Sequence, residues 1–172
     1  MVVAWGKLYK SELFNNIRFP VGKIHEDEFT TYKLFYKANK IAFTTESLLY
    51  YWQRSDSIMG SGFKIKNRLH AIEAYEERAN FYKNIGQHSL AEKTYKQLFG
   101  IYKLVNENIH MFEDENSKNK YIADFNYFKS KLRRNEHSLK FKLYYEAYFI
   151  SPKLAYFLET MNRKIKKLGL YP

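Results

Sequence analysis

Three consecutive acids, Glu26, Asp27 and Glu28, follow a turn marked by Pro20 and Gly22 and lead into a stretch with helical spacing. A helix N-terminus offers unpaired backbone N–H groups and a positive dipole end, so a carboxylate placed there stays ionised. An ionised carboxylate at a loop–helix junction can act as a general base, because it is held in place and can face a cleft. The ordinary alternative is a helix cap, since acids are common at helix starts.

These acids depend on the helix that follows them. From Asp27 to Ala38 the spacing predicts a helix whose buried face carries Phe29, Tyr32, Phe35 and Tyr36. Packing of that face positions Asp27 in the first turn and leaves Glu26 able to bond the backbone or an acceptor. We expect Glu28 to point away.

The acidic junction is the second of three blocks; the first is Ala4–Lys10 and the third is Leu49–Met59. In this order and spacing the blocks resemble the C-terminal part of a family 2 glycosyltransferase with the GT-A fold. The resemblance covers residues 1–63. It implies that Asp27, in the Glu26-Asp27 pair, is the base that deprotonates the acceptor hydroxyl in an inverting transfer from a nucleotide-sugar.

The resemblance also suggests which residues meet the donor. Arg54 and Ser57 lie in the block that closes over the donor diphosphate in such enzymes, and Lys7 lies in a block that lines the cleft. Composition alone favours a plain linker from Arg54 to Phe63, since that stretch is rich in Ser, Asp and Gly. Lys7 has a similarly plain alternative, a lysine in solvent beside an aromatic residue.

One feature departs from the family: the chain contains no Asp-x-Asp motif. The resemblance implies a divalent cation, Mg²⁺ or Mn²⁺, whose ligands lie outside this chain. We therefore expect a C-terminal transferase fragment that lacks most of the donor site and is inactive alone. The implied activity is hexosyl transfer to a glycan or lipid-linked acceptor, in synthesis of a cell-surface polysaccharide.

Short apolar runs predict strands at Val2–Trp5, Ile41–Thr44 and Leu48–Trp52. The predicted fold class is thus α+β, mostly α, with a partial GT-A sheet remnant followed by an α-helical hairpin or bundle. The predicted domains are residues 1–62, the C-terminal part of the catalytic domain, and residues 63–172, a helical extension.

The extension reads as a series of amphipathic helices. Residues 64–85 and 89–112 have apolar stripes separated by Gly86, which predicts an antiparallel hairpin. The hairpin has a faint likeness to a tetratricopeptide repeat, but no second copy follows at the required period. Further helices are expected at 121–132 and 139–149, and Ser151 with Pro152 should open a last one.

Charge is concentrated in the last third of the chain. Residues 1–62 hold 8 Lys and Arg against 6 Asp and Glu, residues 63–115 hold 8 against 8, and residues 116–172 hold 13 against 4. This distribution supports an alternative function, a non-catalytic helical module that recruits an anionic membrane or a partner protein. Nucleic acid is disfavoured, because no recognition motif is present.

Composition narrows the remaining classes. The chain has no Cys, which excludes disulfides, thiolate catalysis and Cys-based zinc sites. No run reaches the length of a membrane span and the N-terminus lacks a signal-peptide pattern. We therefore expect a cytoplasmic protein, and leave open a peripheral position at the inner face of the cell membrane.

Overall fold

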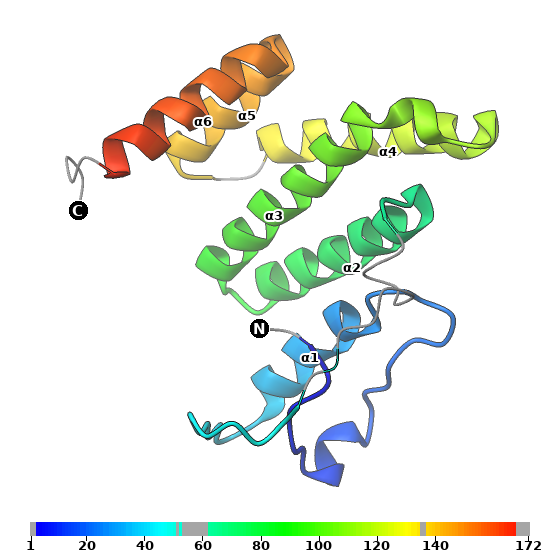
Figure 1. The fold of residues 1–172 in the computed structure, drawn as a ribbon, viewed down its shortest axis with the longest axis vertical. Helices are drawn as coiled ribbons and strands as arrows, with labels where there is room; N and C mark the ends of the chain where they lie inside the picture. Colours follow the sequence, from blue (N-terminus) through cyan, green and yellow to red (C-terminus); the bar gives the residue numbers. More distant parts are fainter. Residues whose placement is uncertain (1–2, 51, 53–61, 135–136, 168–172) are drawn as a thin grey trace. The chain divides into compact units, whose positions relative to one another are not determined.

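The computed structural model describes residues 3–50, 52, 62–134 and 137–167, and every regular element in these ranges is helical (Figure 1). The elements are η1 (Ser11–Phe14), α1 (Glu26–Lys37), α2 (Ile65–Asn84), α3 (His88–Glu107), η2 (Ile109–Met111), α4 (Glu115–Arg134), α5 (Leu139–Ile150) and α6 (Pro152–Lys167). They form two compact units, Met1–Glu113 and Asp114–Pro172. The division at residue 62 concerns catalytic function rather than packing and stays a prediction.

The predicted hairpin is confirmed as α2 and α3, which pack along each other (Figure 1). Five large side chains of α3 are buried, Tyr95, Leu98, Phe99, Tyr102 and Val105, and small residues of α2 let the two helices approach, Ala71, Ala74 and Ala79. The connection contains Gly86, whose φ is +72°. The Gln87 N–H donates to the Tyr82 carbonyl at 2.8 Å, which closes the end of α2 as a glycine cap does.

Gly86→Ala should destabilise the first unit by about 1–2 kcal/mol, the backbone cost of the left-handed region for a residue with a Cβ. Apart from Gly86 and its two chain neighbours, no atom of the described residues lies within 4 Å of the position that this Cβ would take, so steric contact adds nothing. Gly100→Ala is the matched control: Gly100 lies within α3, also with open space, and there alanine should stabilise by roughly 0.5–1 kcal/mol. Urea unfolding followed by circular dichroism measures both, and equal signs would contradict the prediction.

Helix α1 lies against α2 in the first unit. Phe29, Tyr32 and Leu34 are buried, and the Tyr32 ring meets Phe81 of α2 edge to face at 5.1 Å between centroids. The far end of α1 is tied to η1, because Lys37 Nζ donates to the carbonyls of Glu12 and Leu13, each at 3.2 Å. The first turn of α1 is therefore anchored by the rest of its helix. The predicted buried face is only partly right: Phe29 and Tyr32 are buried, Phe35 is half-buried, Tyr36 is 58% exposed, and Leu34 is buried instead.

The α+β fold class, with its GT-A sheet remnant, is wrong: no strand occurs in the described part of the chain. The described residues of the segments expected as strands are irregular, and the second and third segments expose large apolar side chains, Phe43 at 91% and Tyr50 at 83%. A strand needs a neighbour for its backbone hydrogen bonds, and β-propensity describes fit to a sheet surface rather than a local preference. These residues have the composition of strands without that surface.

The second unit is built from α4, α5 and α6. Helix α4 buries one side chain per turn or so, Tyr121, Phe125, Phe128 and Leu132. It is linked to α5 by a two-point ion pair, with Arg133 Nε and Nη2 each 2.8 Å from a Glu146 carboxylate oxygen. That bond lowers the pKa of Glu146. Across the described residues, no helix combines the length and the apolar character needed to cross a membrane.

A single residue separates α5 from α6. The Ser151 N–H donates to the Ala147 carbonyl at 2.9 Å and its own carbonyl accepts from the Ala155 N–H at 3.2 Å, so Ser151 closes one helix and opens the next. Pro152 is the first residue of α6, where its missing N–H costs nothing. The sequence prediction at Ser151 and Pro152 is confirmed.

Candidate functional site

The three acids at the start of α1 occupy three environments. Glu26 is exposed and has no bonded partner in the described ranges. Asp27 is half-buried. Glu28, which we expected to point away, instead faces α2 and forms an ion pair with Arg78. Successive helical residues differ in direction by about 100°, because an α-helix has 3.6 residues per turn, so neighbouring acids need not share a function.

Asp27 is held by the backbone through one oxygen only. Its Oδ1 accepts from the Glu28 N–H at 2.8 Å, and the same N–H also lies 3.0 Å from the His25 carbonyl. Asp27 Oδ2 bonds to none of the residues described here. The carboxylate is thus anchored, as in the capping alternative, and still has one oxygen that can accept a proton from a hydroxyl group.

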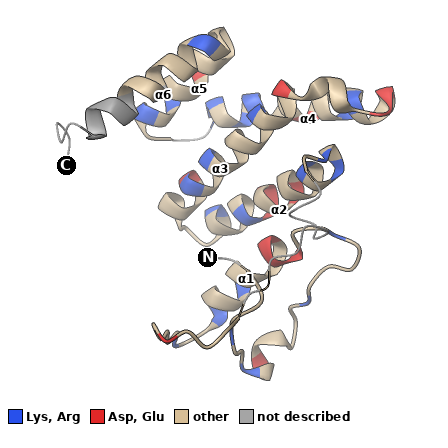
Figure 2. Cartoon of the chain, viewed as in Figure 1, with Lys and Arg blue, Asp and Glu red and all other residues tan. Residues whose placement is uncertain are grey.

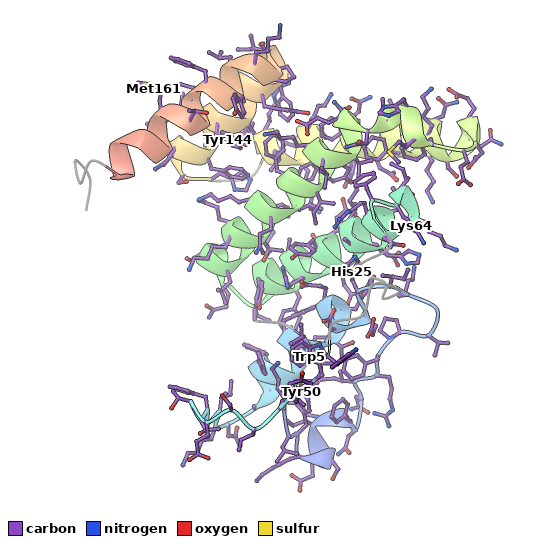
Figure 3. The ribbon with its side chains drawn as sticks, in the orientation of Figure 1. Trp5, His25, Tyr50, Lys64, Tyr144 and Met161 are labelled. Carbon is purple, nitrogen blue, oxygen red and sulfur yellow. The ribbon has the colours of Figure 1, made fainter. Side chains whose placement is uncertain are left out.

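His25 sets the direction in which the chain enters α1 (Figure 3). Its φ of +66° is the one positive value at a non-glycine position in the described residues, a conformation that costs energy for a side chain with a Cβ. Its Nε2 is buried and bonds to no described residue. Such strain gathers at functional sites, and here it lies two residues before Asp27.

Tyr9, a residue of the first block, is affected by the negative charge of Asp27. Burial raises the pKa of the Tyr9 hydroxyl; the neighbouring Thr31 hydroxyl opposes this shift and the negative charge of Asp27 adds to it. The Tyr9 hydroxyl also donates to the Ala4 carbonyl at 3.4 Å. Sequence reasoning missed Tyr9, although it lies within the block that the resemblance places along the cleft.

The Lys7 ammonium group donates to backbone carbonyls of its own segment. Its Nζ lies 2.5 Å from the Val3 carbonyl and 3.5 Å from the Trp5 carbonyl, and the side chain is half-buried. It is therefore neither the solvent-facing lysine of the plain alternative nor a cation already directed at Asp27. Substrate contact by Lys7 stays a prediction.

The first and third blocks are in contact. A methyl group added at Gly6 would lie 3.6 Å from Leu49 Cδ2, and Gly6 has a φ of +68°. Beyond Leu49, the centroids of the Tyr50 and Trp52 rings are 6.3 Å apart. Arg54 and Ser57, the predicted diphosphate ligands, lie outside the described residues.

Arg78 of α2 is the residue that sequence reasoning missed most completely. Its side chain is 7% exposed and that of Glu28 is 15% exposed. Arg78 Nη1 binds Glu28 Oε2, and Nη2 donates to Gln97 Oε1 of α3 at 3.0 Å. Tyr75 donates to Glu28 Oε1 at 3.1 Å, and the guanidinium lies 4.1 Å from the centre of its ring. This network joins α1, α2 and α3, and its carboxylate belongs to Glu28, the residue that follows the candidate base Asp27.

His70 of α2 supports the loop on the other side of His25. Its Nδ1 accepts from the Ile24 N–H at 3.0 Å, so this nitrogen has no proton in the folded state. Burial lowers the pKa of His70, and the nearby charge of Lys23 lowers it further. Lys23 itself pairs with Glu73 at 2.5 Å.

The His70 bond should make the first unit sensitive to acid. A lowered pKa means that the unfolded chain binds the proton more tightly, so stability is complete above the ordinary pKa of about 6.5 and falls as the pH drops below it. We expect the melting temperature to fall between pH 7 and pH 5. His70→Asn keeps an acceptor for the Ile24 N–H without titrating, and should flatten this slope; an unchanged slope would assign the acid sensitivity elsewhere.

No group of three His, Asp or Glu side chains that could hold a metal ion occurs among the described residues. The carboxylates of α1 do not fit one, because Glu28 is committed to Arg78 and Glu26 and Asp27 have different exposure. The residues of this site therefore suit proton transfer and hydrogen bonding rather than metal coordination.

Helices, a strained turn at His25 and a carboxylate with one oxygen that bonds to no described residue do not by themselves identify the functional class of the protein. No protein-family description and no solved structure matches it. Its sequence, however, is related over about half its length to proteins named glycosyltransferases.

Two such relatives come from Streptococcus pneumoniae serotype 4. The chain is 34% identical over 87 residues to "Glycosyltransferase GlyA", a match that covers 50% of this chain and 12% of that protein. It is 35% identical over 72 residues to "Glycosyltransferase GlyG", which covers 42% of this chain and 24% of that protein. The match thus spans less than a quarter of the length of either relative.

Proposed function

We propose that this chain carries the acceptor side of an inverting glycosyltransferase and that Asp27 is its general base. As the acceptor hydroxyl oxygen attacks the anomeric carbon of the nucleotide-sugar, its proton passes to Asp27 Oδ2. The bond from the anomeric carbon to the diphosphate oxygen breaks, and the nucleoside diphosphate leaves with the electron pair. Attack on the face opposite the leaving group inverts the anomeric configuration.

The observation that carries this proposal is the carboxylate of Asp27. One oxygen is fixed by the Glu28 N–H, while the other is free of bonds to described residues. The strained His25 turn precedes Asp27 by two residues, and the negative charge of Asp27 contributes to the raised pKa of the Tyr9 hydroxyl. The partial relationship to two named glycosyltransferases gives the proposal its reaction class.

The donor side is assigned by resemblance. Arg54 would bind the diphosphate through charge-assisted hydrogen bonds, with Ser57 donating its hydroxyl. Lys7 would join them only by exchanging its contact with the Val3 carbonyl. Glu26, which is exposed, could orient the acceptor. We assign the pathway to cell-surface polysaccharide synthesis with a hexosyl donor, and the divalent cation to ligands outside this chain.

The product's anomeric configuration tests the mechanism. The complete reading frame that contains these residues should release nucleoside diphosphate from a hexosyl nucleotide-sugar only when a glycan acceptor is present. Proton NMR of the product should show the anomer opposite to that of the donor. A product with the donor's configuration would exclude Asp27 as the base of an inverting step, and release that is independent of acceptor would indicate hydrolysis.

A further inference from the structure

Helix α6 presents a continuous apolar stripe to its surroundings. Leu154, Phe157, Leu158 and Met161 follow the i, i+3, i+4, i+7 spacing of one helix face and are 41%, 58%, 41% and 44% exposed. Stripes of this kind normally form the core of a domain. Here the residues that should be most buried are open.

The stripe is not what holds α6 to α5. The two helices pack together, and Ala155, on a different side of α6, is fully buried. Helix α5 has exposed apolar residues of its own, Leu139, Leu143 and Ile150, which lie within about 40° of one another around the helix at 3.6 residues per turn. The hairpin therefore has an apolar surface beyond what its own packing uses.

This surface belongs to the most cationic part of the chain. The second unit holds 13 Lys and Arg against 6 Asp and Glu. Lys140 near the start of α5 and Lys153 near the start of α6 are exposed. Figure 2 shows Lys and Arg in blue on both helices. The sequence of the last turns of α6 adds Arg163, Lys164, Lys166 and Lys167.

We propose that the α5–α6 hairpin binds an anionic lipid surface. Helix α6 lies in the plane of the interface, with Phe157, Leu158 and Met161 among the acyl chains and Lys140 and Lys153 at the headgroups. The charge of the unit complements anionic lipid, and lysine stems let the ammonium groups reach the headgroups while the helix is inserted. A nucleic acid would bind the positive charges but would leave the apolar stripe exposed to water.

This inference is independent of the transferase proposal, because it rests on other residues and a different unit. If both hold, the base at α1 acts close to a membrane, where lipid-linked acceptors are found. If transfer is absent, the lipid binding is unaffected. The two proposals therefore fail separately.

Vesicle co-sedimentation of the 172-residue chain tests the inference. The probes are vesicles of phosphatidylglycerol with phosphatidylcholine, and vesicles of phosphatidylcholine alone. The test variant is Phe157→Gln/Met161→Gln, which adds no charge. The matched control is Tyr156→Gln, which changes a residue of the same helix that is 63% exposed but lies on the opposite side from the stripe.

Binding should require phosphatidylglycerol and weaken as sodium chloride rises, because screening removes the attraction of the lysines. The double variant should bind at least about tenfold more weakly, because two apolar side chains no longer insert into the bilayer, while Tyr156→Gln should stay within about threefold. Circular dichroism checks that both variants keep their helices.

Four results would overturn the inference. Equal binding to both kinds of vesicle would show that the lysines do not select an anionic surface. Binding retained by the double variant would show that the stripe does not insert. Binding to duplex DNA in place of vesicles would make the surface a nucleic-acid site. Absence of vesicle binding together with a lower melting temperature of the double variant would mean that the stripe packs against protein.

Discussion

Arg78→Met should destabilise the first unit by about 3–5 kcal/mol, because it leaves the Glu28 carboxylate in the interface between α1 and α2 without its cation. Domains of this size are stable by only about 5–15 kcal/mol, so a large fraction of the stability is lost. Methionine keeps much of the arginine's apolar volume, which confines the change to charge and hydrogen bonds. Urea unfolding monitored by circular dichroism measures the loss.

The ion pair between Lys33 and Glu77 provides a matched control. It joins the same two helices, but its side chains are 32% and 45% exposed, so Lys33→Met should cost no more than about 1 kcal/mol. Arg78→Met/Glu28→Gln should recover most of the stability, since the glutamine oxygen still accepts from Tyr75. If Arg78→Met costs no more than Lys33→Met, the network does not hold the three helices together.

Asp27→Asn should lower the rate of glycosyl transfer by about 10²–10⁴-fold, the usual contribution of a general base. Asparagine keeps an oxygen that accepts from the Glu28 N–H, so the start of α1 should be unchanged. The affinity for the nucleotide-sugar donor should also be unchanged, because Asp27 takes its proton from the acceptor hydroxyl and does not bind the donor. Transfer by the complete reading frame, together with donor titration and the melting temperature, separates these effects.

Glu12→Gln is the control for Asp27→Asn. Glu12 is an exposed acid in the same unit, and its substitution removes one negative charge without altering the α1 turn. Its transfer rate should match that of the unchanged protein. If Asp27→Asn transfers sugar at that same rate, Asp27 is not the base. If Asp27→Asn has a lower melting temperature, its loss of activity comes from a loss of folded protein.

Much of the helical organisation could be predicted from sequence because it is encoded locally. Apolar residues at helical spacing indicate α1, α2 and α3, and Gly86 ends α2 because its backbone adopts a positive φ at no steric cost. Ser151 followed by Pro152 marks the start of α6, because proline has no N–H that would need a partner at the first position of a helix. Each of these signals acts within a few residues of the element that it defines.

The strands failed as a prediction because their signal is not local. Ile41–Thr44 has the residue types of a strand, but a strand forms only when another segment provides hydrogen-bond partners and a surface to cover. The described chain provides neither for this segment, and Phe43 remains exposed. A helix completes its own hydrogen bonds and is less dependent on distant residues.

The sequence by itself therefore determined which segments are helical, where the hairpin turns, and that an acid begins α1. Only the tertiary structure decided which acid does what: Arg78, 50 residues further along the chain, takes Glu28 as its partner, while Asp27 Oδ2 bonds to no residue in the described part of the chain. Helical periodicity depends on neighbours within one turn, whereas burial of a charge depends on whether a distant chain segment brings its counter-charge.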